Sequence, residues 1–435
     1  MELFDKLSQG EALIERAILV QIDFGRSANK SQEMQDEHEF KELVRSAGAQ
    51  DSTLIVGSRK SPDPKFFVGS GKADEIKTAV TQYDADVVIF DHALSPAQER
   101  NIEKHVECRV LDRTALILDI FAQRAKSHEG KLQVELAQLK HMSTRLVRGW
   151  THLERQKGGI GMRGPGETQL ETDRRLLNVR IKQINKRLEK VSMQREQGRQ
   201  LRQKTEIPTV SLVGYTNAGK STLFNKITGS EVYAADILFA TLDPTLRRVN
   251  LPDQQAIVLA DTVGFIRDLP HDLVAAFRAT LQETIEADLI LHVIDSSDEQ
   301  RDFYREEVNK VIRALGAEDV PQLEVMNKID LTEQPVHYDE AHEGLPARVW
   351  LSAVTGEGIP ELLEKLSDIF AKNVFKGHLK LHPALARLRA QLYEDEAVVE
   401  ESISEKGEYL LEVCIQQRRL DTILSKEELT LEQLQ

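Results

Sequence analysis

Cysteine and long apolar runs are both scarce in this sequence of 435 residues, and each absence excludes a class of protein. The two cysteines, Cys108 and Cys414, lie far apart and have no metal-ligating neighbours, so we expect neither a disulfide framework nor a zinc site. No run approaches the roughly 18 apolar residues that a membrane span needs. The N-terminus also lacks the basic start and apolar core of a signal peptide. We therefore expect a cytoplasmic protein with no membrane span. We also expect a monomer.

The composition is typical of folded domains. Hydrophobic residues make up 40% of the chain and charged residues 29%. At about 150 residues per domain, the length suggests roughly three domains. The pattern along the chain predicts an α/β multidomain protein with four parts. These are an N-terminal α/β domain (1–113), a basic helical hairpin (114–205), a second α/β domain (206–372) and a small C-terminal α+β domain (373–435).

Short apolar runs predict the strands of the first and last parts. In the N-terminal part, the runs at 17–22, 52–58 and 86–91 predict buried strands separated by helices. One of these helices is expected to start at Ser95-Pro96, because serine caps a helix and proline fits its first turn. Near the C-terminus, the apolar runs on either side of 405–407 predict a β-hairpin.

Formal charge is distributed unevenly. The whole chain carries −14, yet residues 131–204 hold 18 Lys and Arg against 7 Asp and Glu, a net of +11, so the other 361 residues carry −25. A basic segment inside an acidic protein favours a polyanionic partner, RNA or DNA, for that segment alone. The alternative at this point is a solvated helical face.

The basic segment contains two apolar stripes at helical spacing. The first consists of Leu132, Leu136, Leu139, Met142 and Leu146. The second consists of Leu177, Ile181, Ile184, Leu188 and Val191, with the spacing of a two-stranded coiled coil. Between them, residues 158–167 hold five glycines and a proline, which cannot continue a helix. We predict an antiparallel helical hairpin whose glycine-rich tip carries Arg163.

The strongest chemical signal lies between a predicted strand at 208–214 and a helix-like run. It consists of Gly214, Tyr215, Thr216, Asn217, Ala218, Gly219, Lys220 and Ser221. The glycines allow backbone N–H groups to surround phosphates at a helix N-terminus. We expect Lys220 to reach the β- and γ-phosphates of a bound nucleotide and Ser221 to bind Mg²⁺.

Two further segments complete the predicted phosphate site. Asp261-Thr262-Val263-Gly264 ends a predicted strand 41 residues after Lys220. The Asp261 carboxylate is well placed either to bind Mg²⁺ directly or to hydrogen-bond the groups that bind it. The Gly264 N–H can contact a γ-phosphate. The segment Phe239-Ala240-Thr241-Leu242-Asp243 is expected to close over the nucleotide. Within it Thr241, in preference to Thr245, is expected to bind Mg²⁺.

Two loops predict a site for guanine. Asn327-Lys328-Ile329-Asp330 follows another predicted strand. The Asp330 carboxylate can accept two hydrogen bonds from guanine N1 and N2, which adenine cannot donate, and such a site can discriminate by ~10⁴ or more. Ser352-Ala353-Val354 is expected to contact guanine O6 through backbone N–H groups.

These four blocks are typical of the G domain of a translation-factor-type GTPase, a mostly parallel sheet with helices on both faces, over 206–372. The glycine-rich segments 69–76 and 158–175, taken with the phosphate loop and the blocks 239–245 and 261–266, closely resemble the HflX family of ribosome-associated GTPases. The resemblance covers residues 15–372. Val354 departs from the usual pattern, which has lysine there.

The resemblance implies a GTP- and GDP-binding protein that associates with the large ribosomal subunit and its rRNA, and that splits or rescues stalled or idle ribosomes under stress. The candidate rRNA contacts are Arg163, Arg174, Arg175, Arg180 and Lys182. The resemblance also implies an ATP site in the N-terminal domain. However, Gly69-Ser70-Gly71-Lys72 lacks the spacing of a phosphate loop, and a turn before a helix is the better interpretation.

The expected catalytic residues are Lys220, Thr241, Gly264 and Asn217. Phe265 stands where many GTPases have a glutamine that orients the attacking water. We therefore expect slow turnover without ribosomes and stimulation by them. Asn217 has two interpretations, a ligand of K⁺ beside the phosphates or a residue that only stabilises the loop.

Three functions remain open from the sequence. A GTP-hydrolysing switch acting on the ribosome is preferred. The alternative is a GTPase for ribosome assembly or one coupled to RNA modification. A GTPase coupled to RNA modification would need a catalytic cysteine or cofactor site, which the settings of Cys108 and Cys414 do not suggest. The third is a binding module in which GTP is structural.

Overall fold

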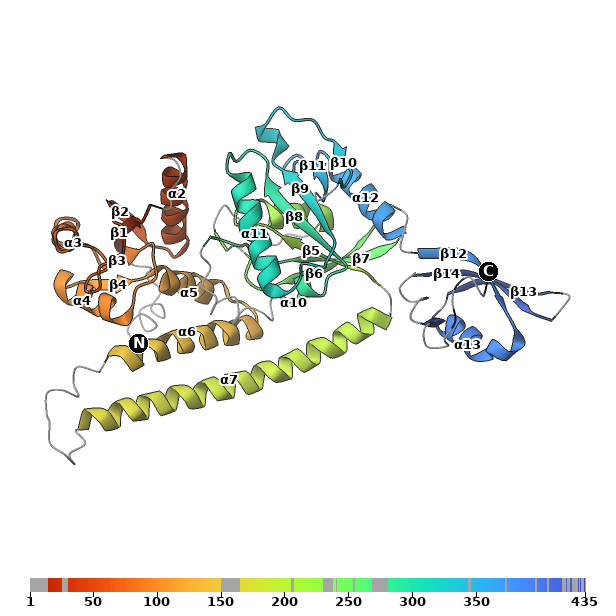
Figure 1. Cartoon of the computed structure of the whole chain (residues 1–435), viewed down its shortest axis with the longest axis horizontal. Coiled ribbons are helices and arrows are strands. Elements are labelled where there is room, and N and C mark those ends of the chain that lie inside the picture. The colour runs from red at the N-terminus through yellow and green to blue at the C-terminus, as the bar shows by residue number, and fades with distance from the viewer. Residues whose placement is uncertain are drawn as a thin grey trace.

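In the structure, a computed structural model, the N-terminal, central and C-terminal domains follow one another along the molecule, and the two long helices run beneath the first two (Figure 1). It describes residues 15–25, 30–149, 165–204, 207–229, 238–239, 241–252, 255–267, 281–342, 346–371, 374–395, 397–404 and 407–416, together with 420, 423–424, 429, 431 and 434.

A parallel sheet in the order β2-β1-β3-β4 forms the N-terminal domain. Its strands are β1 (Arg16–Asp23), β2 (Gln50–Ser58), β3 (Val87–Phe90) and β4 (Arg109–Leu111). Its helices are α2 (Lys30–Ser46), α3 (Ser70–Tyr83), α4 (Pro96–Val106) and α5 (Arg113–Arg124). The three predicted strands are confirmed. The predicted helix start is confirmed too, because Ser95 and Gln98 form a capping box with Pro96 in the first turn.

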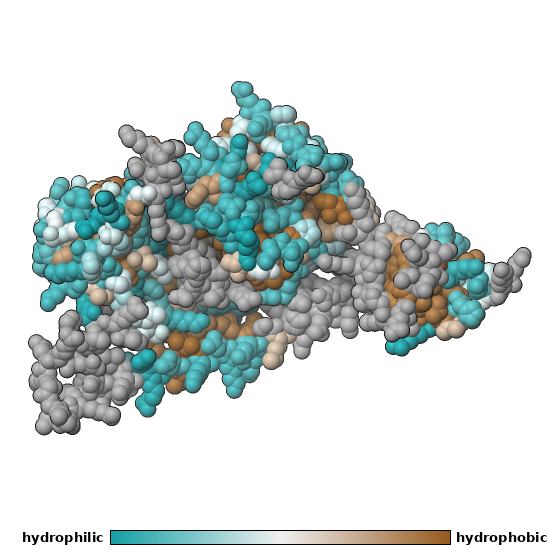
Figure 2. Space-filling view, in the orientation of Figure 1, coloured by the Kyte–Doolittle hydropathy of each residue, from teal (hydrophilic) through white to brown (hydrophobic). Residues whose placement is uncertain are grey.

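Two long helices, α6 (His128–Gly149) and α7 (Pro165–Lys204), lie side by side along one edge of the molecule (Figure 1). Leu132, Leu136 and Leu139 of α6 pack against Ile184 of α7, and Figure 2 shows the apolar band between the two helices. The predicted hairpin seam is therefore confirmed at its centre. The prediction was wrong for Met142, which is 46% exposed.

The glycine-rich tip was predicted to extend to residue 167, and this boundary was wrong. The second helix already begins at Pro165. Proline fits the first position of a helix, because its fixed φ is helical and its missing N–H would have no helical partner there. The rest of the predicted tip, with Arg163, lies outside the described residues.

The central sheet has seven strands in the order β10-β11-β9-β8-β5-β7-β6. The strands are β5 (Thr209–Val213), β6 (Thr245–Asn250), β7 (Ala256–Asp261), β8 (Leu289–Asp295), β9 (Gln322–Asn327), β10 (Tyr338–Asp339) and β11 (Ala347–Trp350). The helices are α8 (Lys220–Thr228), α10 (Gln282–Ile285), α11 (Arg301–Leu315) and α12 (Ile359–Ala371), with a 3₁₀ turn at Ile329–Leu331. All pairs except those of the two edge strands are parallel. The loops after β5, β7, β9 and β11 therefore gather at one edge, and they carry the predicted nucleotide motifs.

The C-terminal domain is an antiparallel sheet in the order β12-β14-β13. It consists of β12 (Val374–Leu381), a 3₁₀ turn at Pro383–Leu385, α13 (Ala386–Glu394), β13 (Val398–Ile403) and β14 (Tyr409–Gln416). The predicted hairpin is confirmed as β13 and β14, and β12 is a third strand that was not predicted. In the part of the chain that the structure describes, no helix is both long enough and apolar enough to span a bilayer.

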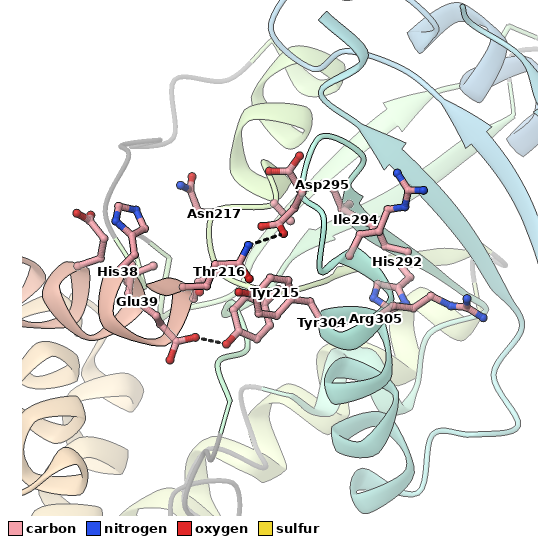
Figure 3. Close-up of a pocket in the computed structure, with 17 residues that line it drawn as sticks. His38, Glu39, Tyr215, Thr216, Asn217, His292, Ile294, Asp295, Tyr304 and Arg305 are labelled. Carbon is pink, nitrogen blue, oxygen red and sulfur yellow. Dashed lines mark hydrogen bonds between the residues drawn. The ribbon is translucent and has the colours of Figure 1, made fainter. Parts of the chain in front are cut away.

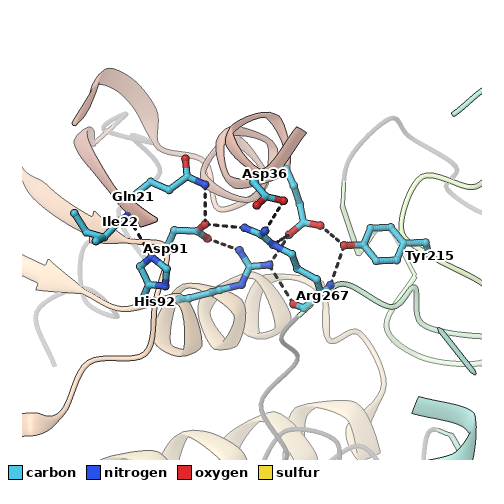
Figure 4. A network of polar contacts seen from close by, with 9 residues as sticks. Gln21, Ile22, Asp36, Asp91, His92, Tyr215 and Arg267 are labelled. Carbon is cyan, nitrogen blue, oxygen red and sulfur yellow. Dashed lines mark hydrogen bonds and ion pairs between the residues drawn. The ribbon is translucent and has the colours of Figure 1, made fainter. Parts of the chain in front are cut away.

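A buried network of charges joins the N-terminal domain to the central sheet domain (Figure 4). Arg113 pairs with Asp91 and with Glu39, the latter at 2.5 Å, and its side chain is 4% exposed. Arg267, which follows β7, pairs with Asp91 at 3.0 Å and also with Asp36. Removing one partner of such a buried pair typically costs about 3–5 kcal/mol, because the other charge is left uncompensated. The N-terminal domain therefore fixes a residue only three positions after Gly264.

Candidate functional site

The loop between β5 and α8 requires glycine at both ends. Gly214 has φ +154°, and a Cβ there would lie 2.3 Å from the Val293 carbonyl oxygen. Gly219 has φ +94°, and a Cβ there would lie 2.2 Å from Nδ2 of Asn327. Both approaches are too close for any side chain, so the loop holds its shape only with these residues. Its N–H groups then lead directly into the start of α8.

Lys220 lies inside this loop rather than in solvent. Its Nζ donates hydrogen bonds to the carbonyl oxygens of Gly214 (3.0 Å) and Tyr215 (2.7 Å), and the residue is 6% exposed. Burial lowers the pKa of Lys220 to about 8, although the charge of Asp261 acts in the opposite direction. The ammonium is thus already positioned at the phosphate loop.

Three predicted metal ligands come together beside Lys220. The Ser221 hydroxyl lies 2.9 Å from the Thr241 hydroxyl, and both donate to Oδ2 of Asp261, at 2.8 and 3.0 Å. Among the described residues, the buried Oδ1 of Asp261 has no hydrogen-bond partner. Burial also raises the pKa of Asp261. Two hydroxyls and a carboxylate with an unsatisfied oxygen are the hard oxygen donors that Mg²⁺ prefers, so the residues fit that ion. Thr245, the rejected alternative, lies in the ladder with β7.

The loop after β7 is tied to the phosphate loop through its backbone. Thr216 N–H donates to the Phe265 carbonyl (2.7 Å), and Phe265 N–H donates to the Gly214 carbonyl (3.1 Å). A Cβ on Gly264 would lie 2.9 Å from Cγ2 of Thr216 and 3.0 Å from the Lys220 Nζ, so Gly264 lies directly against the phosphate loop. The Phe265 side chain is 1% exposed in the core. It therefore cannot orient a water molecule. The two residues between Asp261 and Gly264 are buried, and Thr262 donates to the carbonyl of Leu212 at 2.5 Å.

Asn327 joins three loops of the site. Its Nδ2 donates to the Ala218 carbonyl (2.8 Å), and its Oδ1 accepts the Ala353 N–H (2.9 Å). The following Lys328 pairs with Asp295 at 2.7 Å. Asp330 is exposed in the middle of the 3₁₀ turn. The two guanine loops predicted from the sequence are therefore neighbours, held together by one amide.

The remaining residues of these loops have simple positions. Ile329 and Ser352 are buried, whereas the Val354 side chain is 67% exposed. Sequence reasoning missed the joining role of Asn327, because it depends on three loops that are distant in sequence.

Three residues predicted as nucleotide contacts direct their side chains toward the N-terminal domain or the start of the hairpin instead. The Tyr215 hydroxyl donates to Glu39 and accepts the N–H of Arg267 at 2.8 Å (Figure 4). Phe239 packs edge-on against Phe121 of α5, with ring centroids 4.7 Å apart. Asp243 hydrogen-bonds the residues before α6. At these three positions, only the backbone groups remain to contact a nucleotide, because the side chains are engaged elsewhere. Of their neighbours, Leu242 is buried and Ala240 lies outside the described residues.

A cavity of about 280 Å³ lies between α2 and the outer side of the phosphate loop (Figure 3). Asn217, whose side chain is exposed and whose φ is +61°, lies at this cavity with His38 and Tyr304. Four buried polar atoms of its walls have no hydrogen-bond partner in the described part of the chain: Gln35 Oε1, Thr216 Oγ1, His292 Nδ1 and Arg305 Nε, the last of which is ion-paired with Glu324. No sequence signal indicated this cavity, because α2 and the phosphate loop belong to different domains.

The candidate rRNA residues on α7 differ in availability. Arg174, Arg175 and Lys182 are exposed. Arg180 instead pairs with Glu135 of α6 at 2.6 Å, so it holds the hairpin together. The sequence pattern could not separate these roles, since all four residues lie on one basic helix.

The suggested ATP segment of the N-terminal domain is occupied by internal contacts. Gly69 precedes α3 as its N-cap, and Lys72 donates to the Val56 carbonyl (3.0 Å) and pairs with Glu75 (2.8 Å). This arrangement matches the turn before a helix.

Three family models match the chain in order. The N-terminal region of GTP-binding GTPases matches residues 34–122, their middle region matches 124–202, and a 50S ribosome-binding GTPase model matches 209–328. Among curated relatives, GTPase HflX of Escherichia coli K12 is 60% identical over 412 residues, covering 94% of this chain and 95% of that protein. GTPase HflX of Magnetococcus marinus is 45% identical over 389 residues, covering 89% of each.

Among solved structures, a GTP-binding protein from Sulfolobus solfataricus in complex with GDP is 26% identical, with a TM-score of 0.44 and coverage of 81% of this chain and 98% of that one. The identity to these curated relatives extends over most of both chains. This chain is therefore a GTP-binding, GTP-hydrolysing protein that belongs to the HflX family.

Proposed function

We propose that this protein is a GTP-dependent switch that binds the large ribosomal subunit and its rRNA, and that splits or rescues stalled or idle ribosomes under stress. The observation that carries the proposal is the match of the G domain to a 50S ribosome-binding GTPase model in a chain that also exposes a basic hairpin. Such a protein acts in the cytoplasm, where ribosomes work. An ATP site is not part of the proposal, because Lys72 is already paired.

In this proposal, GTP or GDP binds through backbone N–H groups of 214–221 other than those of Thr216 and Ala218, which donate to the carbonyls of Phe265 and Tyr215. Lys220 donates to the β- and γ-phosphates in place of the two loop carbonyls that now hold it. Ser221 and Thr241 are the protein ligands of Mg²⁺, and Asp261 orients them from behind. The ion, when bound, offsets the negative charge that develops as the γ-phosphate is transferred.

Water positioning is assigned to backbone groups and to the ribosome. The buried Phe265 side chain supports slow intrinsic turnover with stimulation on the ribosome. Gly264 supports sensing of the γ-phosphate, since it lies against Lys220. Asp330, with the N–H group of Val354, supplies the preference for guanine. The N–H groups of Ser352 and Ala353 instead donate to the Glu357 carbonyl and to Asn327 Oδ1, so the contact predicted for 352–354 is reduced to Val354.

Asn217 is the candidate ligand for an activating K⁺ ion, because its exposed amide lies on the phosphate loop. Its positive φ supports the simpler interpretation equally, since asparagine tolerates that conformation. We expect turnover to fall when K⁺ is replaced by Na⁺ at constant ionic strength. A rate that does not respond would leave asparagine as a loop-stabilising residue only.

The splitting activity is tested on whole ribosomes. Purified ribosomes are incubated with the protein and a non-hydrolysable GTP analogue and are then separated on a sucrose gradient. The proposal expects loss of the intact-ribosome peak and protein co-migrating with the large subunit, and expects much less of both with GDP. Intact ribosomes that carry bound protein in every nucleotide state would instead favour a role other than splitting.

A further inference from the structure

Asp243 lies two residues after Thr241, in the segment that leads from the proposed Mg²⁺ site into β6. Its Oδ2 accepts hydrogen bonds from the backbone N–H groups of Lys126 (2.8 Å) and Ser127 (2.7 Å). Its Oδ1 accepts the Ser127 hydroxyl at 2.5 Å. These residues come immediately before α6, so Asp243 is bound to the start of the first helix of the hairpin.

The start of α6 is built around this carboxylate. The Ser127 hydroxyl accepts the N–H of Gly130 at 2.8 Å, which caps the first turn. A Cβ on Gly130 would lie 2.1 Å from Oδ1 of Asp243. Glycine in a helix costs about 0.5–1 kcal/mol relative to alanine, so its presence in this turn is explained by the approach of the carboxylate. The negative charge also interacts favourably with the helix dipole.

The short segment from Thr241 to Asp243 is held at both ends. Thr241 donates to Asp261 and touches Ser221, the groups that would hold the metal ion. Leu242, the only residue between them, is 2% exposed in the core. Neighbouring Cα atoms are about 3.8 Å apart, so Thr241 cannot move by several ångströms without displacing Asp243 or breaking its contacts with α6.

We infer that Asp243 is a positioning residue that couples the state of the nucleotide site to the basic hairpin. In the triphosphate state, Thr241 would be one of the residues that hold the metal ion, and Asp243 would keep the start of α6 in place. After hydrolysis, the nucleotide site would hold Thr241 less firmly, and Asp243 would no longer fix the start of α6. The coupling is a property of this chain alone, and only its effect on ribosomes rests on the proposed function.

Amide hydrogen exchange at Lys126 and Ser127 tests the coupling without ribosomes. We expect exchange that is about tenfold slower with a non-hydrolysable GTP analogue than with GDP. Asp243→Ala should remove that difference, whereas Asp243→Asn, which keeps an accepting oxygen, should retain part of it. Asp302→Ala, which removes a carboxylate that is 84% exposed on α11, is the matched control and should behave like the original protein.

Ser127→Ala reaches the same contact from the hairpin side and serves if Asp243→Ala does not fold. It should reduce the difference, and in combination with Asp243→Asn the two effects should be less than additive. The inference is overturned if the original chain shows equal exchange in both nucleotide states, or if Asp243→Ala keeps the full difference.

Ribosome binding separates this inference from the proposed function. In the original protein, the affinity for large subunits should differ about tenfold between the analogue and GDP, and in Asp243→Ala the ratio should approach one. A chain that shows nucleotide-dependent exchange but binds no ribosomes contradicts the proposed function alone. A variant that keeps the full affinity ratio contradicts the inference alone.

Discussion

At the scale of single residues, the base loop offers the sharpest chemical test. Asp330→Asn replaces two charge-assisted acceptor contacts to guanine with an amide that can donate to the O2 of xanthine. We expect GTP binding to weaken by about 10- to 100-fold and xanthosine triphosphate to bind more tightly than GTP. Equilibrium binding of both nucleotides measures this. Asp319→Asn, at an exposed position before β9, is the control, and a mutant with undiminished preference for GTP would mean that Asp330 does not face the base.

His292 predicts a dependence of stability on pH. It is 1% exposed in β8, and burial lowers its pKa to about 3, with Arg305 and Lys220 acting in the same direction. An unfolded histidine titrates near about 6.5. Below that pH the unfolded chain binds a proton that the folded chain cannot, so the free energy of unfolding falls as the pH falls.

Urea unfolding of the original protein and of His292→Asn measures this effect. Between pH 7 and 5.5, the free energy of unfolding should fall by about 1 kcal/mol more in the original protein than in the variant. This difference corresponds to one group that titrates over about one pH unit. Parallel losses in the two proteins would show that His292 can be protonated in the folded state.

At the scale of elements, the exposed side of α7 is expected to bind rRNA. Replacing Arg174, Arg175 and Lys182 by glutamine should weaken binding to large subunits. It should also lower the salt slope by about one unit for each rRNA phosphate that the variant no longer binds. Arg313→Gln on α11, where the arginine is 53% exposed, removes a similar charge elsewhere and should leave the slope unchanged. The affinity of each variant for large subunits, measured at several salt concentrations, gives the salt slope. Equal slopes in all variants would show that the hairpin is a solvated spacer that does not bind rRNA.

Local patterns predicted the elements well, and contacts between distant elements poorly. The strands of the N-terminal sheet, the phosphate loop and the β13–β14 hairpin each carry a signal within a few residues. By contrast, α6 has a second apolar face, where Val134 and Ala137 join the core of the N-terminal and G domains. This second face was not predicted, because the basic segment was expected to be exposed apart from one apolar stripe on each helix. The pairing of Arg180 and the positions of Tyr215 and Asp243 depend on separate domains meeting, which spacing along a chain does not encode.

At the scale of the whole molecule, the buried charge network is expected to hold the N-terminal domain against the G domain. Glu39→Ala would leave Arg113 and Arg267 undercompensated, and we expect a loss of about 3–5 kcal/mol in the free energy of unfolding. Glu37→Ala on the same helix removes an ion pair with Lys41 that is only partly buried and should cost at most about 1 kcal/mol. Denaturant unfolding of both variants measures the difference, and similar small losses would show that the network does not stabilise the interface.

The central claim is that the nucleotide controls association with the large ribosomal subunit. The most direct measurement is the equilibrium affinity of the purified protein for isolated large and small subunits, by sedimentation at one salt concentration, with a non-hydrolysable GTP analogue and with GDP. We predict binding to the large subunit that is about tenfold tighter or more with the analogue, a coupling of about 1.4 kcal/mol, and no comparable binding to the small subunit. Equal affinity in both nucleotide states, or equal binding to both subunits, would contradict the account.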